Sequence, residues 1–432
     1  MATLAPKLSF YPPSLPDVGG SYPNRVLLSV RGYIVDRANE TTATSSTSKG
    51  QRIQVCFFAA TPPTLSHLCV YCSDSAFTSG PCVIASHGNL ILLSTATRST
   101  SDPFGEEIYY DYFVYSADDT GATSLDRLPD PGHIINRDNV GLVASGSRGD
   151  GYAVVTLNPD PSCKRYIVRV YHEKTGRWRR KIVSRKMLPT ESAGGKGLED
   201  EILPFTSTKV ITLQGSNIAW VDLRGAVLLC DVLDKDPVAY YIPLPKPLND
   251  KNKGFLESPS DPCFFRDTIG RQNAIKFVEM DYRYGGDYAL LGWKAVTFSW
   301  TIGSKNCCTG SVVDLEDVLE NSESMLSLLC LGKGKVESKN ITPMCAPTLC
   351  DRDNTLYLIS KPKRRFLTGS AVAVDTSEKA LRSVIPMSDE RVLGFSLTFL
   401  HCTFSKCFND VGDGSKIEDQ TSNEFLDLSI GR

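Results

Sequence analysis

The sequence predicts a mainly β fold: a β-propeller-like array of short antiparallel strand units with a helix-bearing insertion. Short runs rich in β-branched and aromatic residues, bounded by Gly, Pro, Ser or Asp, follow one another along most of the 432 residues. A strand–turn–strand pattern also recurs three times, which is typical of radially built or sandwiched β-proteins. With 41% hydrophobic and 22% charged residues, the chain has the composition of a globular protein that buries a sizeable core.

The clearest copy of this pattern covers residues 217–245. Two apolar runs are separated by Asp222 and Gly225, the first and last positions of a four-residue turn, which suits a type I turn closing a hairpin. The third run ends in Ile242-Pro243, and proline suits an edge strand because no ladder donor is needed there. Three strands are therefore expected here.

The other two copies follow the same order: an apolar strand, a second strand ending near a turn with an acidic residue, and an outer strand. They comprise residues 151–157, 165–171 and 177–183, and residues 355–360, 371–375 and 381–386. Further strands are expected at residues 26–30, 33–35, 53–58, 66–71, 82–85, 90–93, 112–115 and 295–298. The polar Thr/Ser stretch 38–50 is expected to be a loop.

One domain is expected over residues 25–408, with insertions near 246–272 and 303–350. The second insertion is expected to hold a helix near residues 314–331, because its apolar residues recur at helical spacing. Residues 1–24 are rich in Pro and Ser and are expected to form a flexible N-terminal arm. Residues 409–432 are expected to form a polar, acidic tail.

The balance of charge gives no global attraction for nucleic acid or an anionic membrane, because 47 Lys and Arg face 49 Asp and Glu. No apolar run is long enough to cross a bilayer, and the start of the chain lacks the apolar core of a secretion signal. Cysteines inside apolar strands suit a reducing compartment. A cytoplasmic or nuclear location is therefore expected.

Several segments resemble a large plant family, expanded in grasses, known as domain of unknown function 1618 (DUF1618). The main motif is WVDLRGAVLLCDVL at 220–233, followed by YIPLP at 241–245. Similar pieces, in consistent order, lie at residues 26–30, 33–37, 67–72, 112–115, 275–279, 292–295 and 314–319. The family usually has Trp where this chain has Arg224, a departure that affects one turn.

The resemblance implies no activity, substrate, cofactor or catalytic residue, because the family has none established. Its repeat pattern is similar to that of kelch-like and F-box-associated propellers, which bind other proteins. This is an analogy at the level of the fold.

A metal site is considered at Cys69 and Cys72, with His67 nearby, because two-residue spacing between cysteines forms half of a zinc site. No second half with suitable spacing follows. Two thiols on an apolar strand explain the pattern better, so no metal ligand and no cofactor is predicted.

A basic run on one predicted hairpin is a possible contact for nucleic acid or a protein partner. It includes Arg177, Arg179, Arg180 and Lys181, interleaved with aromatic residues. Such patches can follow a phosphate backbone, although charge runs are more often solvated faces.

Carboxylates at Asp222, Asp231 and Asp375 are the best-placed acids. A pair of them could act as general acid and base if a pocket held them together. Asp at the start of a turn more often bonds its own backbone, so the turn reading is preferred. Because nucleophile-elbow and phosphate-loop motifs are also missing, no catalytic residue is predicted.

The sequence therefore favours a non-enzymatic protein–protein interaction module with an unknown protein partner. A hydrolase that uses carboxylates in a propeller channel is the main alternative, and weak nucleic-acid binding through residues 164–186 is the other. Acidic side chains converging in a deep pocket with perturbed pKa values would favour the enzyme.

Overall fold

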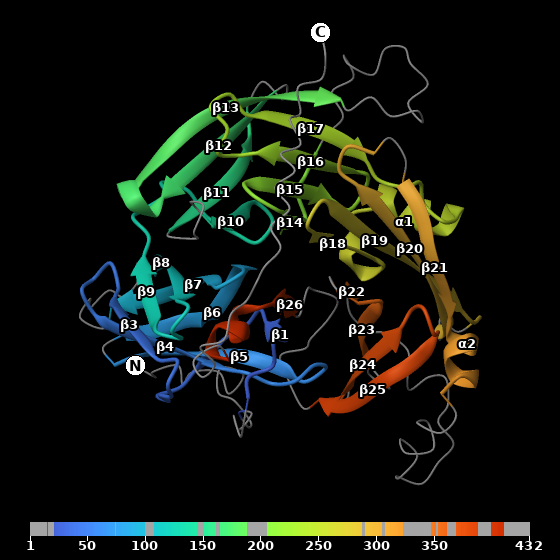
Figure 1. The fold of residues 1–432 in the computed structure, drawn as a ribbon, viewed down its shortest axis with the longest axis horizontal. Helices are drawn as coiled ribbons and strands as arrows, with labels where there is room; N and C mark the ends of the chain where they lie inside the picture. Colours follow the sequence, from blue (N-terminus) through green and yellow to red (C-terminus); the bar gives the residue numbers. More distant parts are fainter. Residues whose placement is uncertain are drawn as a thin grey trace.

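Six units of β-strands stand around a central axis, which confirms the predicted mainly β, propeller-like fold (Figure 1). The structure is a computed structural model. It describes residues 15, 21–73, 75–99, 108–144, 151–160, 165–187, 205–286, 290–304, 307–322, 347–350, 353–360, 369–387 and 399–409.

The first blade joins the two ends of the described chain. Its strands, from the inside outward, are β26 (Phe399–Cys402), β1 (Val26–Ser29), β5 (Leu65–Cys72), β4 (Arg52–Phe58) and β3 (Ala43–Ser46), and β2 (Tyr33–Ile34) also pairs with β5. β26 runs antiparallel to β1, with Val26 opposite Cys402. The last described strand therefore closes the ring on the first.

The other five blades are antiparallel meanders whose strands pair in chain order. The second blade is β6 (Ser75–His87), β7 (Leu90–Ser99), β8 (Ile108–Ala117) and β9 (Thr123–Arg127). The third is β10 (Val140–Ala144), β11 (Tyr152–Pro159), β12 (Arg165–His172) and β13 (Arg177–Met187). The fourth is β14 (Lys209–Thr212), β15 (Asn217–Asp222), β16 (Ala226–Asp231) and β17 (Val238–Pro243). The fifth is β18 (Arg266–Arg271), β19 (Ala274–Tyr284), β20 (Leu290–Thr301) and β21 (Cys307–Asp314). The sixth is β22 (Thr348–Leu349), β23 (Thr355–Ser360), β24 (Gly369–Asp375) and β25 (Ala380–Met387).

The three copies of the predicted strand pattern are the outer three strands of the third, fourth and sixth blades. In the fourth blade the predicted turn is present: the Gly225 N–H donates to the Asp222 carbonyl at 3.0 Å. In the third blade the 3-10 turn Glu173–Thr175 (η2) ends at Gly176, whose φ of 62° suits glycine. Each of these blades has a further, short innermost strand that the sequence analysis did not identify.

The third and fourth blades are joined at their outer strands. The second half of β13 pairs in parallel with β17, from Ser184 opposite Val238 to Met187 opposite Tyr241. This pairing produces one eight-stranded sheet.

The helices differ from the prediction. α2 (Leu315–Glu320) confirms the start of the expected helix but ends after six residues, while residues 323–346 lie outside the described part. A second helix, α1 (Asp250–Glu257), is capped by Asn249, whose side chain accepts from the Asn252 N–H at 2.8 Å. A 3-10 turn, Pro262–Phe264 (η3), precedes β18.

Some segments expected to be loop or insertion contain strands. Residues 43–46 form β3, so the loop predicted at 38–50 is interrupted, because its Thr and Ser backbone pairs with β4. The two expected insertions contain β18, β21 and β22, which belong to the blades.

The end of the predicted N-terminal arm is anchored. Tyr22 is buried, and its ring lies 4.9 Å from that of Phe408 in the 3-10 turn Phe404–Phe408 (η5). The Asn409 side chain donates to the Tyr22 carbonyl at 2.6 Å. The rest of the arm, except residue 15, and the acidic tail at 410–432 lie outside the described residues.

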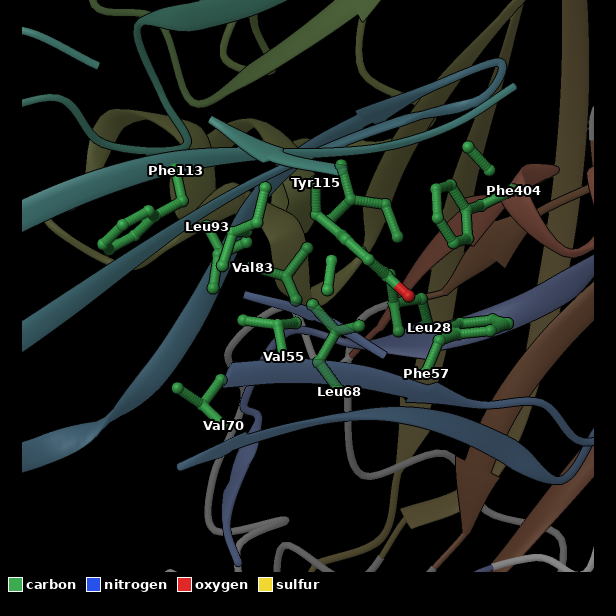
Figure 2. Packing of buried hydrophobic residues seen from close by; sticks show 14 of the residues in the cluster. Leu28, Val55, Phe57, Leu68, Val70, Val83, Leu93, Phe113, Tyr115 and Phe404 are labelled. Carbon is green, nitrogen blue, oxygen red and sulfur yellow. The ribbon is translucent and has the colours of Figure 1, made fainter. Parts of the chain in front are cut away.

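Packing between the first two blades includes Phe404, which lies two residues after the end of β26. Phe404 is fully buried, and its ring lies 5.4 Å from Phe57 and 4.8 Å from Tyr115 (Figure 2). The ring closure is therefore secured by an aromatic contact as well as by strand pairing.

Candidate functional site

The innermost strands of all six blades line a central cavity of about 490 Å³. These strands are β26, β6, β10, β14, β18 and β22. They contact one another around the axis, for example where the Thr212 hydroxyl donates to the Leu142 carbonyl at 2.8 Å. A cavity of this size is within the range of small-molecule sites, which is roughly 300–1,000 Å³. We call it the central channel.

A polar network crosses the channel wall through four blades. Lys209 on β14 pairs with Asp267 on β18 at 2.5 Å, and the other oxygen of Asp267 accepts from the Leu349 N–H of β22 at 3.1 Å. His401 on β26 is in turn hydrogen-bonded to the Leu349 backbone. The inner strands are thus fixed to one another by side chains.

Two buried polar atoms of this wall have no hydrogen-bond partner among the described residues: His401 Nε2 and Thr268 Oγ1. Burial lowers the pKa of His401 to about 3, and the positive charges of Lys209 and Arg25 add to this effect. The imidazole is therefore neutral at pH 7. His401 donates its Nδ1–H to the Leu349 backbone, which leaves Nε2 as an acceptor.

Two carboxylates also line the channel. Burial raises the pKa of Asp138, the charge of Arg137 opposes this, and the negative charge of Asp261 adds to it. Asp261 accepts from the Cys263 N–H at 2.9 Å, and burial together with the Asp261 charge raises the pKa of the Cys263 thiol. This thiol is therefore protonated at neutral pH.

Arg224, where the chain departs from the family pattern, extends from the β15–β16 turn to the loop after α1. Its guanidinium donates to the carbonyls of Ser258 at 2.9 Å and Ser260 at 2.8 Å, and also to that of Leu256. Arg224 thus holds this loop beside the channel.

The three carboxylates singled out in the sequence lie in three different turns. Asp222 accepts from the N–H groups of Thr206 and Arg224, and Asp231 from the Ser216 hydroxyl and the N–H of Leu233. Asp375 accepts from the Ser377 and Glu378 N–H groups and pairs with Arg382 at 2.6 Å. The turn interpretation is confirmed for all three, and the structure does not bring them together.

The basic residues Arg177, Arg179, Arg180 and Lys181 lie on β13, the outer strand of the third blade. Arg180 is directly opposite Arg169 of β12, and both arginines reach the surface. Lys181 donates to the carbonyls of Val232 and Asp234. Whether this strand contacts a partner or nucleic acid stays a prediction.

Cys69 and Cys72 point to opposite faces of β5, because they are three residues apart on a strand. Cys69 packs with Tyr33 and Cys56, whereas Cys72 joins the large cluster around Phe57. Within the part of the chain that the structure describes, no group of three or more His, Cys, Asp or Glu side chains could hold a metal ion. Neither α1 nor α2, the α-helices in that part, is long and apolar enough to cross a membrane.

A family model described as protein of unknown function (DUF1618) matches residues 220–357, which include the main motif, the Arg224 turn and the inner strands β18 and β22. Over these residues the chain is similar to the DUF1618 family. The family resemblance drawn from the sequence is therefore confirmed.

Comparison with other proteins gives no activity for this protein. No curated protein matches it. Among solved structures it is similar to the β-propeller domain of the Trilobed protease from Pyrococcus furiosus, with 8% identity over 74% of this chain and 72% of that chain, at a TM-score of 0.31. It is also similar to a glycosyl hydrolase from Bacteroides ovatus, with 10% identity over 74% and 86% of the two chains, at a TM-score of 0.25.

The residues of the central channel were not identified from the sequence. Lys209, Thr268 and His401 lie on short inner strands and belong to no motif. Only the pairing of the blades brings them to one wall.

Proposed function

We propose that the protein is a non-enzymatic protein-interaction module that binds an acidic segment of its partner at β13. The observation that carries the proposal is the cross-strand pair Arg169–Arg180. Like charges directly opposite one another in a sheet are destabilising, by roughly 0.2–1 kcal/mol. A carboxylate bound between them would offset this cost.

The surroundings of this pair support an acidic partner. Arg177 and Arg179 are exposed on the other side of β13, and no ion pair within the described residues involves either of them or Arg180. Ile182, on the same strand, is 51% exposed and offers an apolar contact beside the charges. Charge for attraction and an apolar side chain for contact area are typical components of a protein interface.

The test measures binding of a fluorescent Glu-rich peptide, its Gln-rich counterpart and a DNA duplex by anisotropy. We expect the Glu-rich peptide to bind most tightly of the three probes, and its affinity to fall as the salt concentration is raised. Its affinity for the Arg179→Ser/Arg180→Ser variant should be at least tenfold lower than for the wild type. The control Arg52→Ser/Lys253→Ser removes two exposed cations elsewhere and should bind normally. Equal binding of the two peptides would refute the proposal, and preferential binding of DNA would favour the nucleic-acid alternative.

A hydrolase remains the second candidate because Asp138 and Asp261 both line the channel and the pKa of Asp138 is raised. A carboxyl group of raised pKa is suited to act as a general acid. If this function is correct, hydrolysis of a chromogenic substrate should fall by at least a hundredfold in Asp138→Asn. Full activity in that variant would exclude Asp138 from the reaction.

The proposal includes a reducing compartment, the cytoplasm or the nucleus. It is supported by Cys56 and Cys69, which lie opposite each other on β4 and β5 as buried free thiols. Fusion to a fluorescent protein and microscopy would test the location.

A further inference from the structure

The lining of the central channel carries an excess of positive charge. Among the described residues, four cationic side chains and two carboxylates line it: Arg25, Arg137, Lys209, Arg224, Asp138 and Asp261. Asp267, which pairs with Lys209 from behind, reduces the excess from two positive charges to one. A cavity with low-dielectric walls and one sign of charge in excess concentrates ions of the opposite sign. The channel therefore favours an anion.

The same wall contains two polar atoms without partners. Thr268 is 0% exposed and its Oγ1 makes no hydrogen bond to a described residue. The side chain of His401 is half-buried, and its buried Nε2 also makes no hydrogen bond to a described residue. A buried polar atom without a partner costs about 1–3 kcal/mol. Two such atoms at one cavity indicate that their partners come from a bound molecule.

The chemistry of these two atoms limits what that molecule carries. The neutral His401 uses Nδ1–H for the Leu349 backbone, so Nε2 can only accept a hydrogen bond. The Thr268 hydroxyl can donate or accept. An O–H donor on the ligand satisfies His401, whereas an inorganic anion without a proton does not.

We propose that the central channel binds a small organic anion that carries hydroxyl groups. Its acid group lies among the cations of the wall, and its hydroxyls bond His401 Nε2 and Thr268 Oγ1. The volume of about 490 Å³ accommodates a molecule the size of a sugar acid or a sugar phosphate. This site is formed by the innermost strands and is separate from β13, so the proposal goes beyond the interaction function.

Isothermal titration calorimetry of the full chain tests this with three probes: glucuronate, glucose 6-phosphate and glucose. We expect one of the two acids to bind at least tenfold more tightly than glucose, and the better acid shows whether carboxylate or phosphate is preferred. Thr268→Val keeps the side-chain shape but removes the hydroxyl, so it should lower the affinity for the tighter-binding acid about 3- to 10-fold. His401→Phe should lower this affinity at least as much.

The matched control is Thr95→Val. Thr95 Oγ1 is also buried without a partner, but it lies on β7 and does not line the channel. This variant, and Arg179→Ser/Arg180→Ser on β13, should bind the acid like the wild type. Failure of both acids to bind, equal binding of glucose, or an equal loss in Thr95→Val and Thr268→Val would overturn the proposal. Each of these results leaves the proposal for β13 unaffected.

Discussion

Arg266 and Glu279 form an ion pair inside the fifth blade whose removal gives the sharpest test of the structure. Arg266 Nη2 lies 2.6 Å and Nε 3.1 Å from the same oxygen of Glu279, and the two side chains are 1% and 0% exposed. Arg266 Nη1 also donates to the Leu223 carbonyl at 2.9 Å, which joins this blade to the fourth. Arg266→Met removes these bonds, together with a longer one from Nη1 to the Arg224 carbonyl at 3.4 Å, and leaves a buried carboxylate without its counter-ion.

Breaking a buried ion pair from one side costs about 3–5 kcal/mol. The other oxygen of Glu279 keeps two donors, the Leu248 N–H at 2.9 Å and the Asn252 side chain at 2.6 Å. We therefore expect the lower end, a loss of about 3 kcal/mol in the free energy of unfolding. With a urea m value of roughly 3 kcal/mol per M, the unfolding midpoint should fall by about 1 M.

The assay is urea unfolding followed by circular dichroism, with Arg283→Met as the control. Arg283 pairs with Asp314 and Glu316 but is 44% exposed, so its removal should cost less than about 1 kcal/mol. The double variant Arg266→Met/Glu279→Met should recover part of the loss, because no unpaired charge remains buried. If Arg266→Met costs no more than Arg283→Met, the burial argument is wrong.

Three further predictions concern packing, pH and ring closure. A Cβ at Gly270 would lie 2.3 Å from the Ile211 side chain and 2.5 Å from that of Leu213, so Gly270→Ala should lower the free energy of unfolding by about 1–3 kcal/mol. In α1, a Cβ at Gly254 would meet no atom within 4 Å, so Gly254→Ala should raise it by about 0.5–1 kcal/mol. Thermal unfolding of the two variants measures both effects. Because the pKa of His401 is about 3 in the folded state, below the usual value near 6.5, protonation favours unfolding as pH falls through this window. Between pH 6.5 and 4, the free energy of unfolding of the wild type should therefore fall by up to about 1 kcal/mol per pH unit more than that of His401→Phe. Parallel curves of unfolding free energy against pH for the two proteins would contradict this. Phe404→Ala should lower the free energy of unfolding by about 3–5 kcal/mol. The side chain of Phe255 is 40% exposed, so Phe255→Ala should lower it much less. Equal denaturation midpoints for the two variants would show that Phe404 does not secure the ring.

The sequence predicts the outer strands better than the inner ones for a physical reason. Residues 165–171 and 226–231 are long enough for alternation and turn residues to identify them. β22 has two residues and β14 has four, too few for a periodic pattern. The outermost strand of the first blade, β3, is not predicted either, because its Thr and Ser resemble a loop. The inner strands also contact inner strands of neighbouring blades that are distant in the sequence, and these contacts leave no local pattern.

The same reason explains why the sequence predicts the roles of Asp222, Asp231 and Asp375 but not the channel. Each of these carboxylates acts on backbone within a few residues, so local sequence is sufficient. Lys209, Asp267 and His401 are linked, through the Leu349 backbone, only after four blades are in place. Their interaction is non-local and has no signal in spacing.

The pairing of β26 with β1 sets the order in which the ring can be completed during synthesis. β1 begins at Val26 and β26 ends at Cys402. At a translation rate of roughly 5–20 residues per second, β1 therefore leaves the ribosome about 20–75 s before its partner strand. Throughout that time β1 presents an unpaired edge, which is open to strands of neighbouring chains as well as to its own. The pairing of β26 of one chain with β1 of another is therefore the expected route to a swapped dimer.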